Sequence, residues 1–173
     1  SIGEYDISTW NNKYTENQTM TDVIIHSDNT GMVFAGRKLG LDRMLSYLRK
    51  FGIGEMTGVD LQGETAPAIR ARDQWYPIDV ATTTFGQGIT VTPLELITAF
   101  TAIANGGKRM EPHVVAQMET NDGKVIEIHP KVLSKPISSK AAKVMTEMMV
   151  NAVNKGEAKY LKPKGYRVAG KTG

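Results

Sequence analysis

The chain of 173 residues is long enough for one domain with a packed core, and its 40% hydrophobic residues exclude a disordered tail. A formal net charge of +3, from 21 basic and 18 acidic side chains, is too small to indicate a nucleic-acid partner. No stretch reaches the roughly 18 uninterrupted apolar residues that a membrane helix needs. The absence of cysteine fits any compartment, and because the first residue is not methionine, an upstream targeting segment could have been removed.

The first helical pattern follows eighteen polar residues that we expect to be irregular. Residues 19–22 (TMTD) fit a capping box, in which the first and last side chains bond the backbone at a helix start. The apolar residues after them recur at helical spacing. A short helix is therefore predicted to run to about His26 and to present Ser27 at its end.

Two more helices are predicted before a long loop region. Thr30 is a candidate cap for a helix that Gly40 stops, and Asp42 opens another that continues toward Phe51. Ser27 would then lie between helices. Residues 52–87 are rich in glycine and turn residues, with Pro67 and Pro77 as expected breaks, so we expect extended surface loops there.

The middle of the chain predicts a helix and then a hairpin. Residues 92–95 (TPLE) combine an N-cap, a proline at the first helical position and a capping glutamate, which predicts a core helix that runs to Asn105. Residues 114–119 and 124–128 are typical of two strands. The Asn-Asp-Gly sequence at 121–123 would turn them into a hairpin.

The last third of the chain predicts a helix, a basic loop and a strand. Ser138 or Ser139 can cap a methionine-rich helix that ends near Asn154, and packing in a core explains its methionines best. The lysines between residues 155 and 167 fit a solvated loop. Residues 166–173 (YRVAGKTG) alternate as a strand does, and their small glycines would let an extended peptide add to the sheet edge.

Two tripeptides carry chemistry when they occur together. Ser27-Asp28-Asn29 and Lys171-Thr172-Gly173 match two of the three patterns of a serine acyl-transfer site. Each alone is better explained structurally, the first as a helix-capping turn and the second as the polar end of a strand. The third pattern, Ser-x-x-Lys, is absent, because no serine has a lysine three positions later. The pair in this order therefore predicts a piece of an enzyme rather than a whole one.

Four stretches resemble class B penicillin-binding proteins, the peptidoglycan D,D-transpeptidases, and they come in that family's order. They are residues 27–40, 47–64, 85–96 and 165–173. The resemblance implies an α+β fold of the β-lactamase and transpeptidase type, in which helices lie on the faces of an antiparallel sheet beside a helical subdomain. Residues 1–173 would be a partial transpeptidase domain, which begins after the nucleophile motif and reaches the Lys-Thr-Gly motif.

The resemblance implies catalytic roles for three residues. Ser27 would relay a proton to or from the nitrogen of the scissile or attacking group, since a hydroxyl both donates and accepts. Asn29 would hold the lysine of the missing motif and a substrate amide. Lys171 would supply positive charge beside Ser27 and toward the terminal carboxylate of the substrate.

Three neighbouring residues are implied in substrate binding. Thr172 would hydrogen-bond the substrate carboxylate, Gly173 would leave room for the ligand, and Asp28 occupies the position that varies among these enzymes. No metal is expected, because the three histidines show no ligand spacing with carboxylates, and no cofactor is expected either.

The implied partners are peptidoglycan stem peptides, β-lactam antibiotics and cell-wall synthesis proteins, on the outer side of a membrane to which the parent protein is anchored. This chain alone is expected not to be acylated by penicillin, because it lacks the nucleophile and the oxyanion donors. Two alternatives stay open. One is a non-catalytic binding or β-lactam-sensing module of the same fold, and the other is a D,D-carboxypeptidase or β-lactamase, in which water replaces the acceptor amine.

Overall fold

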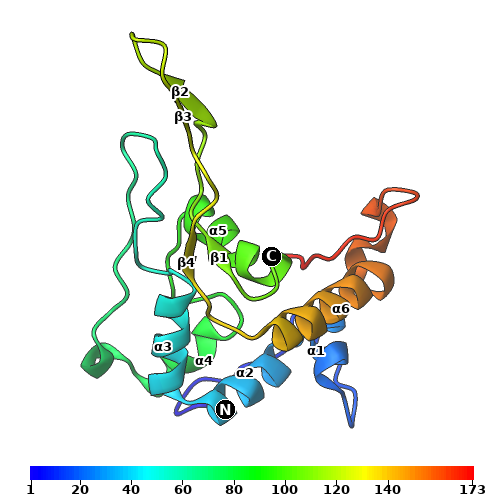
Figure 1. Ribbon diagram of the computed structural model, residues 1–173. Coiled ribbons are helices and arrows are strands. Elements are labelled where there is room, and N and C mark those ends of the chain that lie inside the picture. The colour runs from blue at the N-terminus through cyan, green and yellow to red at the C-terminus, as the bar shows by residue number, and fades with distance from the viewer. The chain divides into compact units, whose positions relative to one another are not determined.

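The computed structural model describes residues 1–173, apart from the side chain of Ala158. The chain divides into two compact units. The first unit comprises Ser1–Leu45, Arg70–Ile89 and Lys143–Gly173, and the second comprises Ser46–Ile69 and Thr90–Ala142. Helices α1 to α5 precede four consecutive short strands, which pair in antiparallel sheets, and α6 follows them (Figure 1). This segregation of helices and strands is typical of an α+β protein. No helix among the described residues is both long and apolar enough to cross a membrane.

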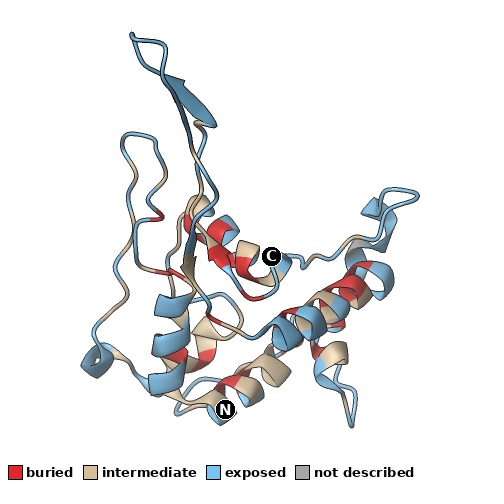
Figure 2. Cartoon of the chain, viewed as in Figure 1, coloured by how far each residue is buried: buried red, intermediate tan, exposed pale blue. Residues whose placement is uncertain are grey.

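The first unit is helical and contains both tripeptide motifs. Its elements are α1 (Met20–His26), α2 (Asn29–Leu39), the start of α3 (Leu41–Lys50), the 3-10 turn η1 (Arg72–Gln74), α4 (Pro77–Thr83), most of α6 (Ser139–Lys155) and the 3-10 turn η2 (Glu157–Leu161). Its α-helices carry the buried apolar residues of the unit, which are coloured red on the cartoon in Figure 2. Burial of these residues stabilises the short helices, since helices of this length are marginal alone.

The capping box at the start of α1 is confirmed. The Thr19 hydroxyl accepts from the Asp22 N–H at 3.2 Å, and the Asp22 carboxylate accepts from the Thr19 N–H at 2.9 Å. The helix ends at His26, so Ser27 stands at its end as predicted. The cap predicted for α2 is wrong by two residues, because Asp28 and not Thr30 is the N-cap, while Gly40 ends the helix as expected.

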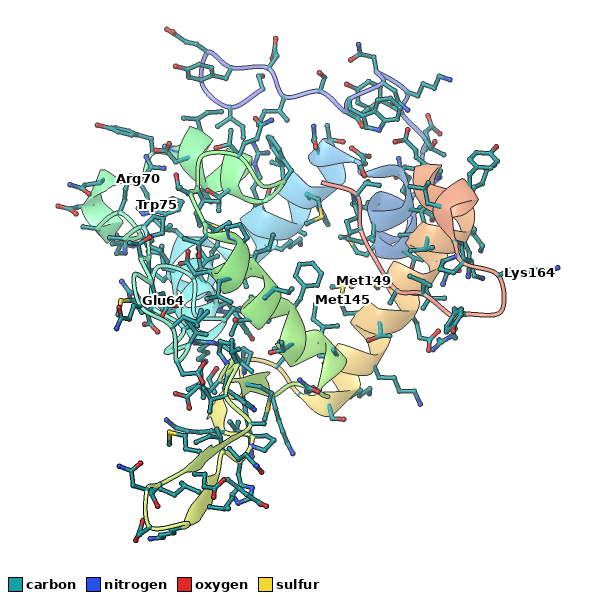
Figure 3. All side chains as sticks on the ribbon, turned by 90° about the horizontal axis from the view of Figure 1, so that it is seen from above. Glu64, Arg70, Trp75, Met145, Met149 and Lys164 are labelled. Atoms are coloured by element: carbon teal, nitrogen blue, oxygen red, sulfur yellow. The ribbon has the colours of Figure 1, made fainter. Side chains whose placement is uncertain are left out.

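The methionine-rich helix α6 is confirmed, and Ser138 is its cap. The Ser138 hydroxyl accepts from the Ala141 N–H at 3.1 Å, and the helix ends at Lys155. Met149 is buried and Met145 is partly buried, one turn apart on α6 (Figure 3). The core interpretation of these methionines therefore holds. Lys164, in the exposed loop that follows, points outward.

The interpretation of residues 52–87 as loops alone is incomplete. Pro77 does not break the chain but occupies the first position of α4, where its missing N–H costs nothing. The Asp79 carboxylate accepts from the Tyr76 N–H at 2.9 Å and pairs with Arg70 at 3.1 Å. The Arg70 guanidinium also lies over the Trp75 ring, 4.9 Å from its centroid (Figure 3).

The second unit is built around helix α5 (Pro93–Ala104), which is confirmed with its capping glutamate. The Glu95 side chain is 1% exposed. One of its carboxylate oxygens accepts from the Thr92 N–H at 2.6 Å and the other from the Gly54 N–H at 2.7 Å. Glu95 thus caps its own helix and also fixes a distant loop. In that loop region Glu64, labelled in Figure 3, accepts from the Thr57 N–H at 2.6 Å.

Two small antiparallel sheets complete the second unit. One pairs β1 (Arg109–Met110) with β4 (Val132–Ser134), which the sequence did not predict because two or three residues are too few for a pattern. The other is the predicted hairpin of β2 (Gln117–Glu119) and β3 (Val125–Glu127), shorter than expected. The hairpin projects from the unit and every residue of its strands is exposed (Figures 1 and 2).

The strand predicted for residues 166–173 is wrong. No residue of this segment belongs to a strand. A strand is stabilised by a ladder of hydrogen bonds to a neighbour, and none of the four strands in the described part of the chain pairs with it. Its Gly170 N–H instead donates to the Met149 carbonyl on α6 at 3.4 Å. The Lys171 motif therefore lies on an irregular segment and not on a sheet edge.

Candidate active site

Ser27 has a backbone conformation that a non-glycine residue rarely adopts. It caps the C-terminus of α1 with φ 52° and ψ 43°, in the left-handed region. For a residue with a Cβ this conformation costs roughly 1 kcal/mol or more, and such strain is common at functional sites. The turn lets the chain reverse between α1 and α2 within two residues. Ser27 therefore stands at the junction of the two helices.

Asp28 is buried, with 6% of its surface exposed, and both of its carboxylate oxygens are engaged. One oxygen accepts from the Thr30 N–H at 2.8 Å, the Thr30 hydroxyl at 2.7 Å and the Gly31 N–H at 3.4 Å. The other accepts from the Gln18 side chain at 3.2 Å. These bonds satisfy the free N–H groups at the start of α2 and tie it to the preceding loop. The substrate-binding role of Asp28 stays a prediction, beside this structural one.

Asn29 is the first residue of α2, and its side chain is bound to the N-terminal loop. Its Nδ2 donates to the Ser8 carbonyl at 3.1 Å. That bond leaves the Oδ1 atom as the acceptor that an ammonium or amide N–H can reach. The same loop approaches Ser27 again, where the Trp10 indole N–H donates to the His26 carbonyl at 3.1 Å.

Two glycines allow the helices around Ser27 to pack closely. A Cβ added at Gly31 would lie 2.4 Å from a methyl of Val23, so α1 and α2 approach without a side chain between them. A Cβ added at Gly156 would lie 2.4 Å from the Ala152 carbonyl oxygen and 2.9 Å from that of Ile25. The end of α6 is thus pressed against the end of α1, immediately before Ser27.

Lys171 bridges the two predicted motifs. Its ammonium donates a hydrogen bond to the Ser27 hydroxyl, across 144 residues of sequence. It also donates to the Thr172 carbonyl at 2.8 Å and to the Thr172 hydroxyl at 3.1 Å. A lysine ammonium has three N–H groups, so all three are used. Because both hydroxyls act as acceptors here, their own protons remain available for other groups.

Desolvation and the carboxylate of Glu157 shift the pKa of Lys171 in opposite directions. Partial burial lowers the pKa of its ammonium, because a low-dielectric environment disfavours the charged form, and the negative charge of Glu157 opposes that decrease. Both side chains line a cavity of about 190 Å³ between α1, α6 and the C-terminal segment. The lysine is therefore positioned as a polar group at the wall of a small cavity beside Ser27.

The two remaining predicted residues flank this lysine. Thr172 lines the same cavity. Gly173 is exposed, and a Cβ added there would meet no atom within 4 Å. The structure thus brings together Ser27, Lys171 and Thr172, and open space lies beside Gly173.

The sequence interpretation missed Ser8, Gln18, Gly31 and Glu157. Ser8 contributes through its backbone and Gln18 through a bond to Asp28, and neither is marked by a local pattern. Gly31 could have been noticed, because a glycine inside a helix often permits a close approach. Among the described residues, no group of three or more histidine, aspartate or glutamate side chains could hold a metal ion.

Solved structures with the same fold define the class of protein. The chain matches penicillin-binding protein 3 from Mycobacterium tuberculosis, solved with aztreonam, with a TM-score of 0.74 and 32% identity over 87% of this chain and 32% of that one. The D,D-transpeptidase domain of a peptidoglycan glycosyltransferase from Eggerthella lenta gives a TM-score of 0.85 over 100% of this chain and 45% of that one, at 24% identity. The fold is that of the penicillin-recognising serine enzymes, incomplete here, as the sequence predicted.

Sequence relatives specify the family. The model of the penicillin binding protein transpeptidase domain matches residues 2–173, and the chain belongs to this family. It is 34% identical over 158 residues to stage V sporulation protein D of Bacillus subtilis, covering 90% of this chain and 24% of that protein. It is 31% identical over 170 residues to the peptidoglycan D,D-transpeptidase MrdA of Haemophilus influenzae, covering 89% and 26%. The chain thus spans about a quarter of the length of these curated relatives.

Proposed function

We propose that this chain carries the proton-relay and carboxylate-binding part of a penicillin-binding serine D,D-transpeptidase. The observation that supports this most directly is the hydrogen bond from Lys171 to Ser27, which joins the second and third motifs of the family. A surface lysine with no such role would remain in solvent, because a buried ammonium is disfavoured. Lys171 is exposed as a residue, but its ammonium does not point freely into solvent and donates instead to the Ser27 and Thr172 hydroxyls.

The proposed reaction has two steps. A nucleophilic serine attacks the carbonyl between the two D-alanines of a stem peptide, the peptide C–N bond breaks, and the terminal D-alanine leaves after its nitrogen receives a proton. An amine of a neighbouring strand then attacks the ester carbonyl and loses a proton, a new amide C–N bond forms, the bond between the acyl carbon and the serine oxygen breaks, and the serine oxygen regains a proton. The proposal assigns this nucleophile to the longer protein, since no Ser-x-x-Lys pattern occurs in the 173 residues.

Ser27 is proposed to pass protons to and from the reacting nitrogen. Its oxygen accepts from Lys171, so its O–H can donate to a leaving amine. When a second amine attacks, the same hydroxyl can accept the proton that this amine loses. The positive charge of Lys171 stabilises the hydroxyl oxygen whenever that oxygen carries excess negative charge.

The carboxylate of the stem peptide is proposed to bind at Thr172. The Thr172 hydroxyl accepts from Lys171 at 3.1 Å, so its own proton is free for an anionic oxygen. All three N–H groups of Lys171 are used, so its ammonium acts on that carboxylate through its charge rather than by a direct bond. Asn29 is proposed to hold a substrate amide and the lysine of the nucleophile motif.

The substrates and location follow from the relatives and belong to the same proposal. Peptidoglycan stem peptides are the proposed substrates. β-Lactams are the proposed inhibitors, by analogy with the M. tuberculosis protein solved with aztreonam and with ampicillin. The longer protein is proposed to be anchored in the membrane with this domain on the outer face, where it would act with other cell-wall synthesis proteins in cell division or cell shape.

The experiment is to incubate the longer protein with a fluorescent penicillin and to map the label by mass spectrometry. Label on a serine of a Ser-x-x-Lys sequence is expected, and the same protein should join a donor pentapeptide to an acceptor amine. Hydrolysis without amine transfer would instead indicate a carboxypeptidase or β-lactamase. A folded protein without label would indicate the non-catalytic module, and a stable adduct on the 173-residue chain itself would contradict the assignment of the nucleophile.

A further inference from the structure

The cavity beside Lys171 has a mostly apolar wall. Aliphatic side chains of Ile24 on α1 and of Ala152 and Val153 on α6 form much of it. The charged groups that line it are the ammonium of Lys171 and the carboxylate of Glu157, which begins η2. In such surroundings an isolated ammonium is disfavoured, whereas an ammonium near a carboxylate is stabilised.

Gly156, the residue before Glu157, is packed against the end of α1. A Cβ at Gly156 would lie 2.9 Å from the Ile25 carbonyl oxygen, two residues before Ser27. The Gly156 N–H also donates to the Ala152 carbonyl at 2.8 Å, which continues the hydrogen bonding of α6 by one residue. The backbone that carries Glu157 is therefore packed directly on the backbone that carries Ser27.

Glu157 supplies the negative charge on this side of the lysine. The end of α1 presents the Ser27 hydroxyl to Lys171, and the C-terminal segment presents Thr172, and both of these groups are neutral. Glu157 also lines a neighbouring cavity of about 500 Å³, where it faces His26, Lys155 and Lys159; these three basic groups do not line the cavity beside Lys171. No ion pair within 4 Å joins Glu157 and Lys171 in the described part of the chain, so the carboxylate acts through space across the cavity.

We propose that Glu157 is a positioning residue that keeps Lys171 charged and directed at Ser27 during acyl transfer. This inference rests on the proposed function. Without the Glu157 carboxylate, nothing opposes the effect of desolvation, so the pKa of Lys171 falls further. The ammonium then loses a proton at a lower pH and becomes a neutral amine. A neutral amine can no longer donate to both hydroxyls and the Thr172 carbonyl, and it no longer attracts a substrate carboxylate.

The test measures the second-order rate constant of acylation by fluorescent penicillin from about pH 6 to about pH 10 in the longer protein. For Glu157→Gln, the alkaline decline should move to lower pH, with a rate about 3-fold or more below that of the unchanged protein near pH 9 and within about 2-fold at roughly pH 6 to 7. Glu157→Asp keeps the charge, so the pH profile of its acylation rate should lie nearer that of the unchanged protein. Glu147→Gln is the matched control, because Glu147 on α6 pairs with Arg167 at 2.5 Å and does not line the cavity.

The outcomes separate a positioning role from a structural one. A Glu157→Gln profile that superimposes on the unchanged one overturns the inference, as does an equal shift in Glu147→Gln. Glu157 is exposed, so its variants should fold, and thermal denaturation verifies this; Glu157→Ser replaces the glutamine variant if that one does not fold. If the unchanged protein itself is not labelled, the proposed function fails instead.

Discussion

The candidate site has two halves, the turn at Ser27-Asp28-Asn29 and the segment of residues 166–173. They are held in place in different ways. Around Ser27, bonds from Asp22, Gln18 and Asp28 lie within about ten residues of the motif, and the loop at Ser8 adds one more. Residues 166–173 have no strand partner among the described residues, and this segment depends on the bonds of Arg167, Gly170 and Lys171 to the helices. The first half is specified locally and the second by distant contacts. Substitutions should therefore affect the halves differently.

The largest effect should come from the residue that joins the halves. Lys171→Ala removes the charge and the bond to Ser27, and the acylation rate of the longer protein should fall about 10² to 10³-fold. Lys171→Arg keeps the charge, but a planar guanidinium cannot reproduce three diverging N–H groups, so a loss of about 10-fold is expected. Stopped-flow acylation measures both. A Lys171→Ala rate within twofold of the unchanged protein would show that the halves work independently.

The second largest effect is expected at Gly156, where the end of α6 packs against the end of α1. Gly156→Ala places a Cβ 2.4 Å from the Ala152 carbonyl oxygen on α6 and 2.9 Å from the Ile25 carbonyl oxygen on α1, and should destabilise the protein by about 1 to 3 kcal/mol. Gly170→Ala is the control, because its Cβ would meet Val153 at an ordinary 3.4 Å. Urea denaturation compares the two variants. Equal midpoints would mean that the contact between α1 and α6 is not tight.

A smaller effect is expected at the cap of α2. Asp28→Ala removes the acceptor for the Thr30 N–H and one of the two acceptors of the Gln18 side chain, which should cost about 1 to 2 kcal/mol. Asp28→Asn keeps a capping oxygen and should cost less than half as much. Denaturation midpoints, read together with acylation rates, test this order. If the asparagine variant were the less stable one, the charge of Asp28 rather than its capping geometry would matter.

The smallest effect concerns the support of the second half by an exposed ion pair. Arg167 and Glu147 are joined at 2.5 Å, with side chains that are 59% and 52% exposed. Such pairs contribute about 0.2 to 1 kcal/mol, less at high salt. A double-mutant cycle of Glu147→Gln and Arg167→Gln at low and high salt measures the coupling. A coupling above about 2 kcal/mol would mean that this pair, and not Lys171, holds the segment.

The sequence predicted the fold best where adjacent residues carry the information. The capping patterns at Thr19 and Thr92 and the Asn-Asp-Gly turn of the hairpin were sufficient for α1, α5 and the hairpin. It failed at Pro77, because a proline signals either a break or a helix start and only the bond of Asp79 to the Tyr76 N–H decides between them. It also failed at residues 166–173, because alternation shows that a strand is possible and not that a partner pairs with it.

In the candidate site, too, the sequence predicted what adjacent residues determine and missed what distant contacts determine. The tripeptides identified Ser27 and Lys171, and the resemblance to a family supplied their roles. The opposition of burial and Glu157 at Lys171 could not be predicted, because it depends on the packing of Gly156 against Ile25, far apart in the sequence. The same holds for Ser8, whose contribution is a carbonyl that every residue possesses.

The left-handed backbone at Ser27 also limits which hydroxyl amino acid can serve there. Threonine carries the same group, but its branched Cβ makes a positive φ of 52° much less favourable than it is for serine. A Ser27→Thr variant would either strain the junction between α1 and α2 or rotate its hydroxyl away from Lys171. The choice between the two alcohols at this position is thus decided by the backbone and not by the reactivity of the oxygen.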